Sequence, residues 1–315
     1  ICRDVSEVRA DLDRILGRVR AAGAAVGVTL AAAGSHPFAR HRDRLIYPAE
    51  RYRTLIDRNR WLAQRLMIFG LHVHLGVRDG DHAMAMINGL THYLPHLLAI
   101  SASSPFWQGS DTGLASSRIA VFEALPTAGH PCTFETWQDF VRTYDAMIAS
   151  RAITSVKDLW WDIRPHPAYG TVEIRICDGL PTLTEAVSLV ALVHALATRL
   201  DAQIRDGRRF LPPAYWILRE NKWRASRWGL EAEIVMDDSG RTSLLRTEVQ
   251  ALVRALGGVA ARLRGGAALE SLAAVLERDP SYVRQRKIFE RQQSLVAVAQ
   301  SLVQEFATDT AVETR

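Results

Sequence analysis

The sequence predicts an α+β fold in which helices cover one face of a small sheet. Helical and strand-like segments are intermixed over 1–180, whereas helical patterns dominate 181–306. No glycine-rich phosphate loop follows a strand, which argues against a Rossmann or P-loop domain. A sheet backed by helices satisfies this order of elements. The length of 315 residues suits one large domain or two small ones, and a frayed tail is expected at 307–315.

Composition excludes several classes of protein. With 48% hydrophobic and 23% charged residues, the chain is neither disordered nor of low complexity. Its longest apolar stretch, 186–197, is interrupted by His194 and is shorter than the roughly 20 residues that span a bilayer, so no membrane segment is expected. Cys2, Cys132 and Cys177 are too widely spaced for a disulfide framework, which favours a reducing cytoplasm. The net charge of +5 suits a small anionic ligand no less than a nucleic acid.

The N-terminal part contains the patterns of two helices and two strands. Apolar residues recur every three or four positions over 4–22, which predicts an amphipathic helix. The β-prone residues 26–30 run into the turn-forming 34–37, which predicts a strand and then a loop. A helical pattern over 49–66 leads directly into a predicted strand at 67–77.

The same periodicities predict the remaining elements. In the middle of the chain we expect helices and strands at 81–102 (helix), 134–149 (helix), 159–164 (strand) and 170–177 (strand). After that we expect helices only, at 183–204, 213–226, 242–256, 267–278 and 280–306.

Residues 70–76, with the sequence GLHVHLG, are the first segment that indicates chemistry. Side chains of a strand alternate between its two faces, so His72 and His74 share one face while apolar residues occupy the other. Two imidazoles flanked by glycines can hold a divalent metal or contact a nucleotide. A purely structural histidine pair is the alternative, because His-x-His alone is a weak signal.

A second strand carries Glu173 and Arg175 on one face, opposite the apolar Val172, Ile174 and Ile176. A carboxylate can bind a metal, and a guanidinium can bind a phosphate or a carboxylate, so this pair suits a ligand of mixed charge. A cross-strand ion pair on a solvated face would show the same pattern.

Residues 103–118 form a long stretch without regular periodicity, and stretches of more than about 12 to 15 such residues are usually functional or disordered. Phe106 and Trp107 give it the anchors that disordered linkers lack, so we expect a loop that covers a ligand. Arg118 at its end is then an anion contact, and the alternative is a solvated arginine at a helix start.

Two further segments combine aromatic and basic residues. Trp160 and Trp161 face opposite sides if extended, which predicts one core residue and one cleft wall just ahead of Arg164. Arg224 and Arg227 lie three apart on a predicted helix and can clamp phosphates together, although a solvated helix face is the commoner case. Arginines interleaved with tryptophan also suit single-stranded nucleic acid, which is the least favoured ligand here.

Five segments in this order resemble the YbdK-type carboxylate-amine ligases, the type 2 glutamate-cysteine ligase family. They are 70–76, 104–107 with 111–113, 160–165, 170–175 and 220–225. Five ordered blocks between about residues 1 and 306 are far more specific than any one of them. The resemblance implies a glutamine-synthetase-like catalytic domain of 1–315, with a curved antiparallel sheet backed by helices and a helical C-terminal part.

The resemblance also implies roles for single residues. It assigns metal binding to His72 and Glu173, and catalysis beside the transferring phosphate or the substrate carboxylate to Arg175 and Arg164. It assigns nucleotide or anion binding to His74, Arg118, Asn221, Arg224 and Arg227. The implied cofactors are ATP and Mg²⁺ or Mn²⁺.

The implied reaction is ATP-dependent amide formation through an acyl phosphate, with glutamate and cysteine as the expected acid and amine. The resemblance implies small-molecule substrates and a homo-oligomer, with a dimer expected. The cysteine pattern predicts a cytoplasmic protein, and neither nucleic acid nor a membrane is expected as a partner. Family members begin with a strand bearing a Gly-x-Glu-x-Glu-type motif that supplies further metal carboxylates. No such strand precedes Ile1 in this sequence, and Glu7 lies on an amphipathic helix, so we expect part of the metal site to be missing.

Two other functions remain open from the residues alone. The chain can be a nucleotide- or anion-binding module without turnover, or a metal-dependent hydrolase that uses His72 and His74. His92 and His96 are four apart but lack the glutamate of an HExxH zinc motif, so we expect them to be core or surface residues.

Overall fold

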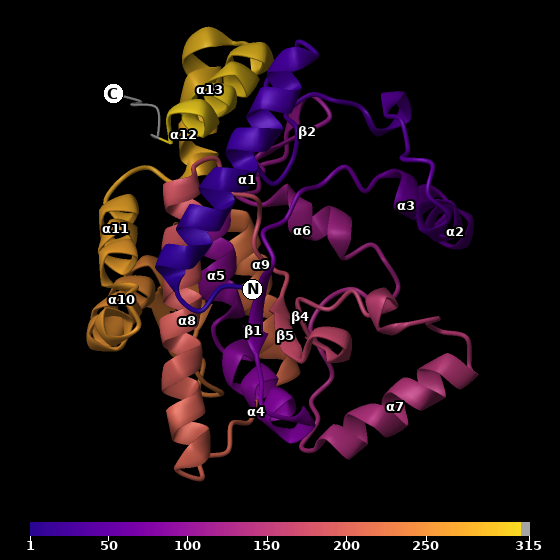
Figure 1. Cartoon of the computed structure of the whole chain (residues 1–315), viewed down its shortest axis with the longest axis vertical. Helices are drawn as coiled ribbons and strands as arrows, with labels where there is room; N and C mark the ends of the chain where they lie inside the picture. The colour runs from indigo at the N-terminus through magenta and orange to yellow at the C-terminus, as the bar shows by residue number, and fades with distance from the viewer. Residues whose placement is uncertain (310–315) are drawn as a thin grey trace.

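The computed structural model describes residues 1–309. A three-stranded antiparallel sheet lies at its centre, and two-stranded hairpins lie elsewhere in the described chain. Helices make up most of the remainder, so the predicted α+β class is confirmed. In Figure 1, α8 separates α10 and α11 from the strands, while α2, α3 and α7 lie on the opposite side of the strands.

From the N-terminus to β4, the elements are α1 (Val5–Ala25), η1 (His41–Asp43), α2 (Glu50–Asn59), α3 (Trp61–Gln64), β1 (Val73–Gly76), α4 (Gly80–Thr91), α5 (Leu94–Ser101), β2 (Phe106–Trp107), β3 (Ser110–Asp111), α6 (Ser117–Phe122), α7 (Trp137–Ala149), η2 (Val156–Asp158) and β4 (Ile163–His166). They are followed by η3 (Pro167–Tyr169), β5 (Thr171–Ile174), α8 (Leu183–Arg205), α9 (Tyr215–Trp228), η4 (Gly229–Glu231), β6 (Glu233–Val235), β7 (Thr242–Leu244), α10 (Leu245–Arg262), α11 (Gly266–Leu276), α12 (Ser281–Gln292) and α13 (Leu295–Thr308).

The central sheet has the order β1-β5-β4, and its register fixes which residues lie side by side. Glu173 on β5 is directly opposite His74 on β1 and Arg164 on β4. Because side chains alternate along each strand, these three residues share one face. The other face carries Val172 and Ile174, which are fully buried against the helices of the main core. The predicted division into one polar and one apolar face is therefore confirmed.

Helix α8 is the central helix of that core. Thr182 and Glu185 form a capping box at its N-terminus, which satisfies backbone donors that a helix start leaves free. By length and composition α8 is the one described helix that could span a membrane. However, 67% of its most apolar stretch is buried inside the protein, as is common for the core helix of a globular domain.

Several predicted helices are divided in the structure. The helix expected at 49–66 breaks at Arg60, where φ is 48°, and the one expected at 280–306 breaks at Gln293, where φ is 49°. Neither position has the glycine or proline that usually marks such a break. The helix expected at 81–102 divides into α4 and α5, with Pro95 in the first turn of α5. Proline is well tolerated there because its missing N–H has no helical partner.

Two expectations about strands are wrong. Residues 26–30 are not a strand, and the backbone N–H of Val28 instead bonds the carbonyl of Gly23 at the end of α1. The region after 183 is not purely helical, because β6 and β7 form a hairpin that precedes α10. In addition, the predicted loop 103–118 contains the short hairpin β2-β3.

The predicted frayed tail begins with ordered residues. Helix α13 continues to Thr308, and Asp309 accepts a 2.7 Å hydrogen bond from the backbone N–H of Thr184. The rest of that predicted tail, 310–315, lies outside the described residues.

Candidate active site

The polar face of the central sheet gathers the residues that the sequence singled out on two separate strands. Glu173 is only 3% exposed, and its Oε1 lies 3.3 Å from Nδ1 of His72 and 3.8 Å from Nε2 of His74. Nε of Arg164 donates to the other carboxylate oxygen at 2.8 Å, and Nη1 of Arg175 donates to Oε1. One buried carboxylate thus joins two imidazoles and two guanidinium groups.

These contacts shift the protonation equilibria of the cluster. Burial alone would raise the pKa of Glu173, but the hydrogen bond from His72 and the charges of Arg175 and Arg164 outweigh it and hold that pKa well below its usual range. Burial lowers the pKa of His72, which is therefore a neutral imidazole at pH 7. Burial and the neighbouring Arg164 lower the pKa of Arg175 to about 10, which leaves it cationic at neutral pH.

Arg164 is fixed in place from both ends. Besides Glu173, it donates from Nη1 to the carbonyls of Val156, Lys157 and Leu159 at 3.0, 2.9 and 2.9 Å. It therefore holds η2 against the sheet through Nη1, while its Nε is bound to Glu173. The guanidinium of Arg175 donates to Glu173, lies 6.0 Å from the ring centroid of Phe122, and borders open space.

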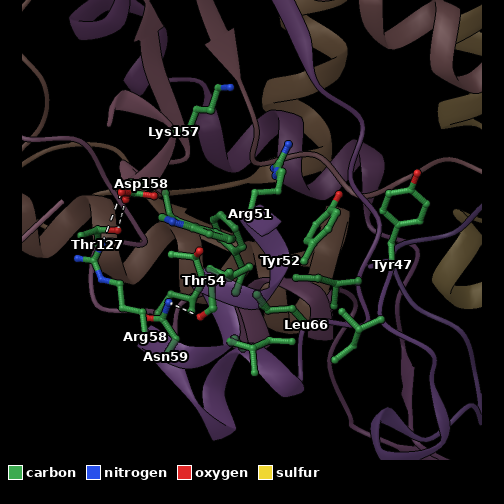
Figure 2. Close-up of a pocket in the computed structure, with 18 of the residues that line it drawn as sticks. Tyr47, Arg51, Tyr52, Thr54, Arg58, Asn59, Leu66, Thr127, Lys157 and Asp158 are labelled. Atoms are coloured by element: carbon green, nitrogen blue, oxygen red, sulfur yellow. Dashed lines mark hydrogen bonds and ion pairs between the residues drawn. The ribbon is translucent and has the colours of Figure 1, made fainter. Parts of the chain in front are cut away.

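That space is a cavity of about 650 Å³ between the polar face of the sheet and the α2 segment. His72 and Arg175 line it from the sheet, and Trp160 and Phe122 line it from the neighbouring loop and α6. Figure 2 shows the opposite wall, where Arg51, Tyr52, Thr54 and Arg58 extend from α2, with Lys157 and Asp158 of η2 facing them. The cavity therefore joins residues that lie more than a hundred positions apart in the sequence.

Arg118 also lines the cavity, but most of its guanidinium is committed. It is 3% exposed, and it donates to the carbonyls of Ile176 and Arg175 at 3.0 and 2.9 Å. It is thus not the solvated arginine of the alternative interpretation. It holds the strand that carries Arg175, and Gly70 leaves room for it, because a Cβ at Gly70 would lie 2.4 Å from its Nη2.

Three predicted nucleotide contacts lie elsewhere. The amide of Asn221 bonds both backbone groups of Val235, at 2.8 and 2.7 Å, and so holds β6 against α9. Arg224 donates to Glu220 and to the carbonyl of Glu233, and Arg227 donates to the carbonyl of Gly113. None of the three lines the described cavity. Their nucleotide-binding role stays a prediction.

Comparison with known proteins decides the family. The profile of "Glutamate-cysteine ligase family 2(GCS2)" matches residues 1–312. A protein of Bdellovibrio bacteriovorus named "Putative glutamate--cysteine ligase 2" is 47% identical over 312 residues, which cover 98% of this chain and 82% of that protein. Proteins of the same name from Thermobifida fusca and Gloeobacter violaceus are 45% and 43% identical, over 97% and 98% of this chain and 77% and 83% of theirs.

The chain belongs to glutamate-cysteine ligase family 2. The resemblance inferred from five ordered segments is therefore confirmed, and a ligase is favoured over a hydrolase or a binding module.

The adjacent tryptophans of this family 2 protein divide as predicted. Trp161 is 6% exposed and packs in the core against Phe134 and Phe140. Trp160 lines the cavity and contacts Phe122, with ring centroids 5.7 Å apart. The alternation of an extended chain predicted one core and one cleft residue, and the structure shows which is which.

Arg51 and Lys157 of the opposite cavity wall, and His166 at the end of β4, were not predicted from the sequence. Arg51 and Lys157 line the cavity, but on their own short segments they resemble ordinary solvated cations. His166 is 8% exposed, and its ring stacks on Tyr169 at 4.3 Å between centroids, with His74 5.5 Å from His166. A signal for His166 was present, since it lies two residues after Arg164 and therefore on the same face.

The described residues do not complete a metal site for a family 2 ligase. In the part of the chain that the structure describes, no group of three His, Cys, Asp or Glu side chains is arranged to hold a metal ion. Both oxygens of Glu173 are bound by arginines. Mg²⁺ prefers several oxygen ligands, and this cluster offers one carboxylate and two imidazoles. We therefore derive no step through a metal.

Proposed function

We propose that this protein is an ATP-dependent carboxylate-amine ligase that joins the side-chain carboxylate of glutamate to the amine of cysteine. The observation that carries the proposal is the cationic Arg175, held by a buried carboxylate at the wall of a cavity large enough for small-molecule substrates. Membership of glutamate-cysteine ligase family 2 supports the class of reaction.

The proposed reaction has two steps. A carboxylate oxygen of the acid attacks the γ-phosphorus of ATP, the bond to the β-phosphate oxygen breaks, and ADP leaves. The amine nitrogen then attacks the acyl carbon, the carbon–oxygen bond to phosphate breaks, and the nitrogen loses a proton to solvent. The products are an amide, ADP and phosphate.

The chain's own residues would act chiefly by positioning and electrostatics, which dominate phosphoryl transfer. Arg175 would stabilise charge on the transferring phosphoryl group or the reacting carboxylate. Glu173 orients Arg175, and Arg164 in turn orients Glu173. His72 lines the same wall and is neutral at pH 7, so it can accept or donate a hydrogen bond without adding charge.

ATP and a divalent cation, Mg²⁺ or Mn²⁺, are the cofactors we propose. We further propose that the protein works as a homodimer in the cytoplasm. Its three cysteines support a reducing compartment, because none forms a disulfide and two are exposed.

The test is release of ADP from ATP and Mg²⁺ in the presence of glutamate and cysteine. We expect ADP to form only when both amino acids are present. Arg175→Met should lower kcat by about 10² to 10³, the usual cost of removing one donor to a developing charge. Arg254→Met changes an exposed arginine of α10 and serves as the matched control. Binding of ATP without product under any combination of amino acids would instead support a binding module.

A further inference from the structure

The cavity wall formed by α2 and η2 carries positive charge that the protein does not neutralise. Across residues 1–309, Arg51 and Lys157 have no side-chain hydrogen bond or ion pair, although both line the cavity. The guanidinium of Arg51 lies over the ring of Tyr52, 4.9 Å from its centroid. That stacking orients Arg51 and leaves its N–H donors available.

The acidic residues of the same wall are already paired with other arginines. Asp158 accepts a 2.7 Å hydrogen bond from the backbone N–H of Thr154, and it lies 3.4 Å from Arg58. Glu50 is mainly solvent-exposed and lies 3.8 Å from Arg53. Neither carboxylate is paired with Arg51 or Lys157, and both cations are exposed, so they are available to an anion from solution.

The two cations are held in fixed relation to each other. Arg51 and Arg58 are seven residues apart on α2, which is close to two helical turns and puts them on one side of the helix. Arg58 donates to the carbonyl of Ala152 and pairs with Asp158, so it ties that side of α2 to the η2 segment that carries Lys157.

The same wall is linked to the sheet. The backbone carbonyl of Lys157 accepts a 2.9 Å hydrogen bond from Arg164, the residue that also binds Glu173. Arg175 contacts that same Glu173. Three hydrogen bonds therefore connect Lys157 with the cationic Arg175, and both residues line the same cavity as Arg51.

The rest of the lining distinguishes among possible anions. Leu55, Phe122, Leu125 and Trp160 line the cavity as well. These four side chains offer a polyphosphate no donor, although Arg44, Thr54 and Arg58 line other parts of the cavity. A short aliphatic chain with an anionic group at each end can place its methylene groups against them and its ends against the cations.

We propose that Arg51 and Lys157 form a carboxylate subsite that binds the non-reacting carboxylate of the acid substrate, while its reacting carboxylate lies by Arg175. The acid is then a dicarboxylate, and these two residues select it over a monocarboxylate. This inference rests on the proposed ligase function for the identity of the reacting carboxylate.

Equilibrium binding tests the subsite without requiring turnover. Calorimetry compares glutamate with 4-aminobutyrate, which lacks the non-reacting carboxylate. We expect Arg51→Met and Lys157→Met each to raise the Kd for glutamate about tenfold, the cost of one charge-assisted hydrogen bond. The Kd for 4-aminobutyrate should not change. Arg53→Met is the matched control, because Arg53 is on α2 but does not line the cavity.

Kinetics supply the second measurement. The substitutions should raise KM for glutamate and leave KM for ATP unchanged. A rise in the Kd or KM for ATP, with glutamate unaffected, would mean that the two cations hold the polyphosphate and would overturn the proposal. Failure of the wild-type protein to bind glutamate would also overturn it. Selective loss of glutamate binding in a protein without ADP release would retain the subsite and reject the ligase function.

Discussion

Arg164 and Glu173 face each other on neighbouring strands, with Nε of the arginine 2.8 Å from Oε2 of the glutamate. Both side chains are nearly inaccessible, at 6% and 4% exposed. Such a pair is costly to desolvate, and it is retained where it fixes other groups. Here it connects Arg175 on one side with the backbone of η2 on the other.

Glu173→Gln should destabilise the fold by about 3 to 5 kcal/mol, because it leaves two buried guanidinium groups without their counter-charge. The folded-state pKa of Glu173 is depressed, so its contribution is complete above the unfolded value of about 4.3 and is lost as the pH falls below it. Urea unfolding should therefore show a wide gap between wild type and variant at pH 7 that narrows towards pH 3.

The control for that experiment is Glu270→Gln, which changes an exposed glutamate on α11. It should leave the free energy of unfolding within about 0.5 kcal/mol of wild type. An equal loss of stability in both variants would show that Glu173 has no special place in the sheet.

His96 should make the protein sensitive to mild acid. It is only 8% exposed in α5, and burial lowers its pKa from 6.5 to about 4. Between pH 6.5 and 4 the unfolded chain binds a proton that the folded protein does not bind. The free energy of unfolding therefore falls by about 3 kcal/mol over this range. In urea titrations, His96→Gln should lose correspondingly less free energy of unfolding than wild type between pH 7 and 4.5, and an equal loss in both proteins would contradict this role of His96.

Lys222 should stabilise the fold through buried ion pairs, and it is not an ordinary surface cation. It is 3% exposed, and its Nζ lies 2.6 Å from both Asp162 and Glu123. Lys222→Met leaves Asp162 buried and unpaired and should cost about 3 to 5 kcal/mol in free energy of unfolding. The double change with Asp162→Asn should cost clearly less than the sum of the single changes. Strict additivity would contradict a direct interaction.

Substitution of each adjacent tryptophan can separate effects on core stability from effects on binding in the cavity. Trp161→Ala removes a core side chain and should cost about 3 to 5 kcal/mol. Trp160→Ala opens the cavity and should mainly weaken binding of glutamate, with a smaller loss of stability. Unfolding curves and calorimetry on both variants check this, and a reversed order of effects would be incompatible with the structure.

The sequence predicted side-chain placement best where the alternation along a single strand determines which face a residue occupies. The alternation along 70–76 and 170–175 placed His72, His74, Glu173 and Arg175 on one face, as the structure finds. It could not show that Glu173 is saturated by arginines, because Arg164 reaches it only through strand pairing. The alternation of side chains within one strand does not reveal which strands pair with each other.

Other differences have equally physical causes. Residues 26–30 have strand-like side chains but no partner strand, so propensity alone did not make a strand. Asn221 lies in a segment that resembles the family, yet its direction is set by a hairpin whose strands have three residues each. Arg51 and Lys157 lack any local signal, since only the tertiary fold brings them to one cavity.

The α2 segment has a consequence for how such an enzyme can change over time. No residue of α2 is buried, although several line the cavity. Substitutions on such a surface typically alter stability by less than about 0.5 kcal/mol. The core packed around α8 supports the fold independently of them. Duplicated copies of the gene can therefore diverge in the acid they accept through α2 while each retains a stable protein.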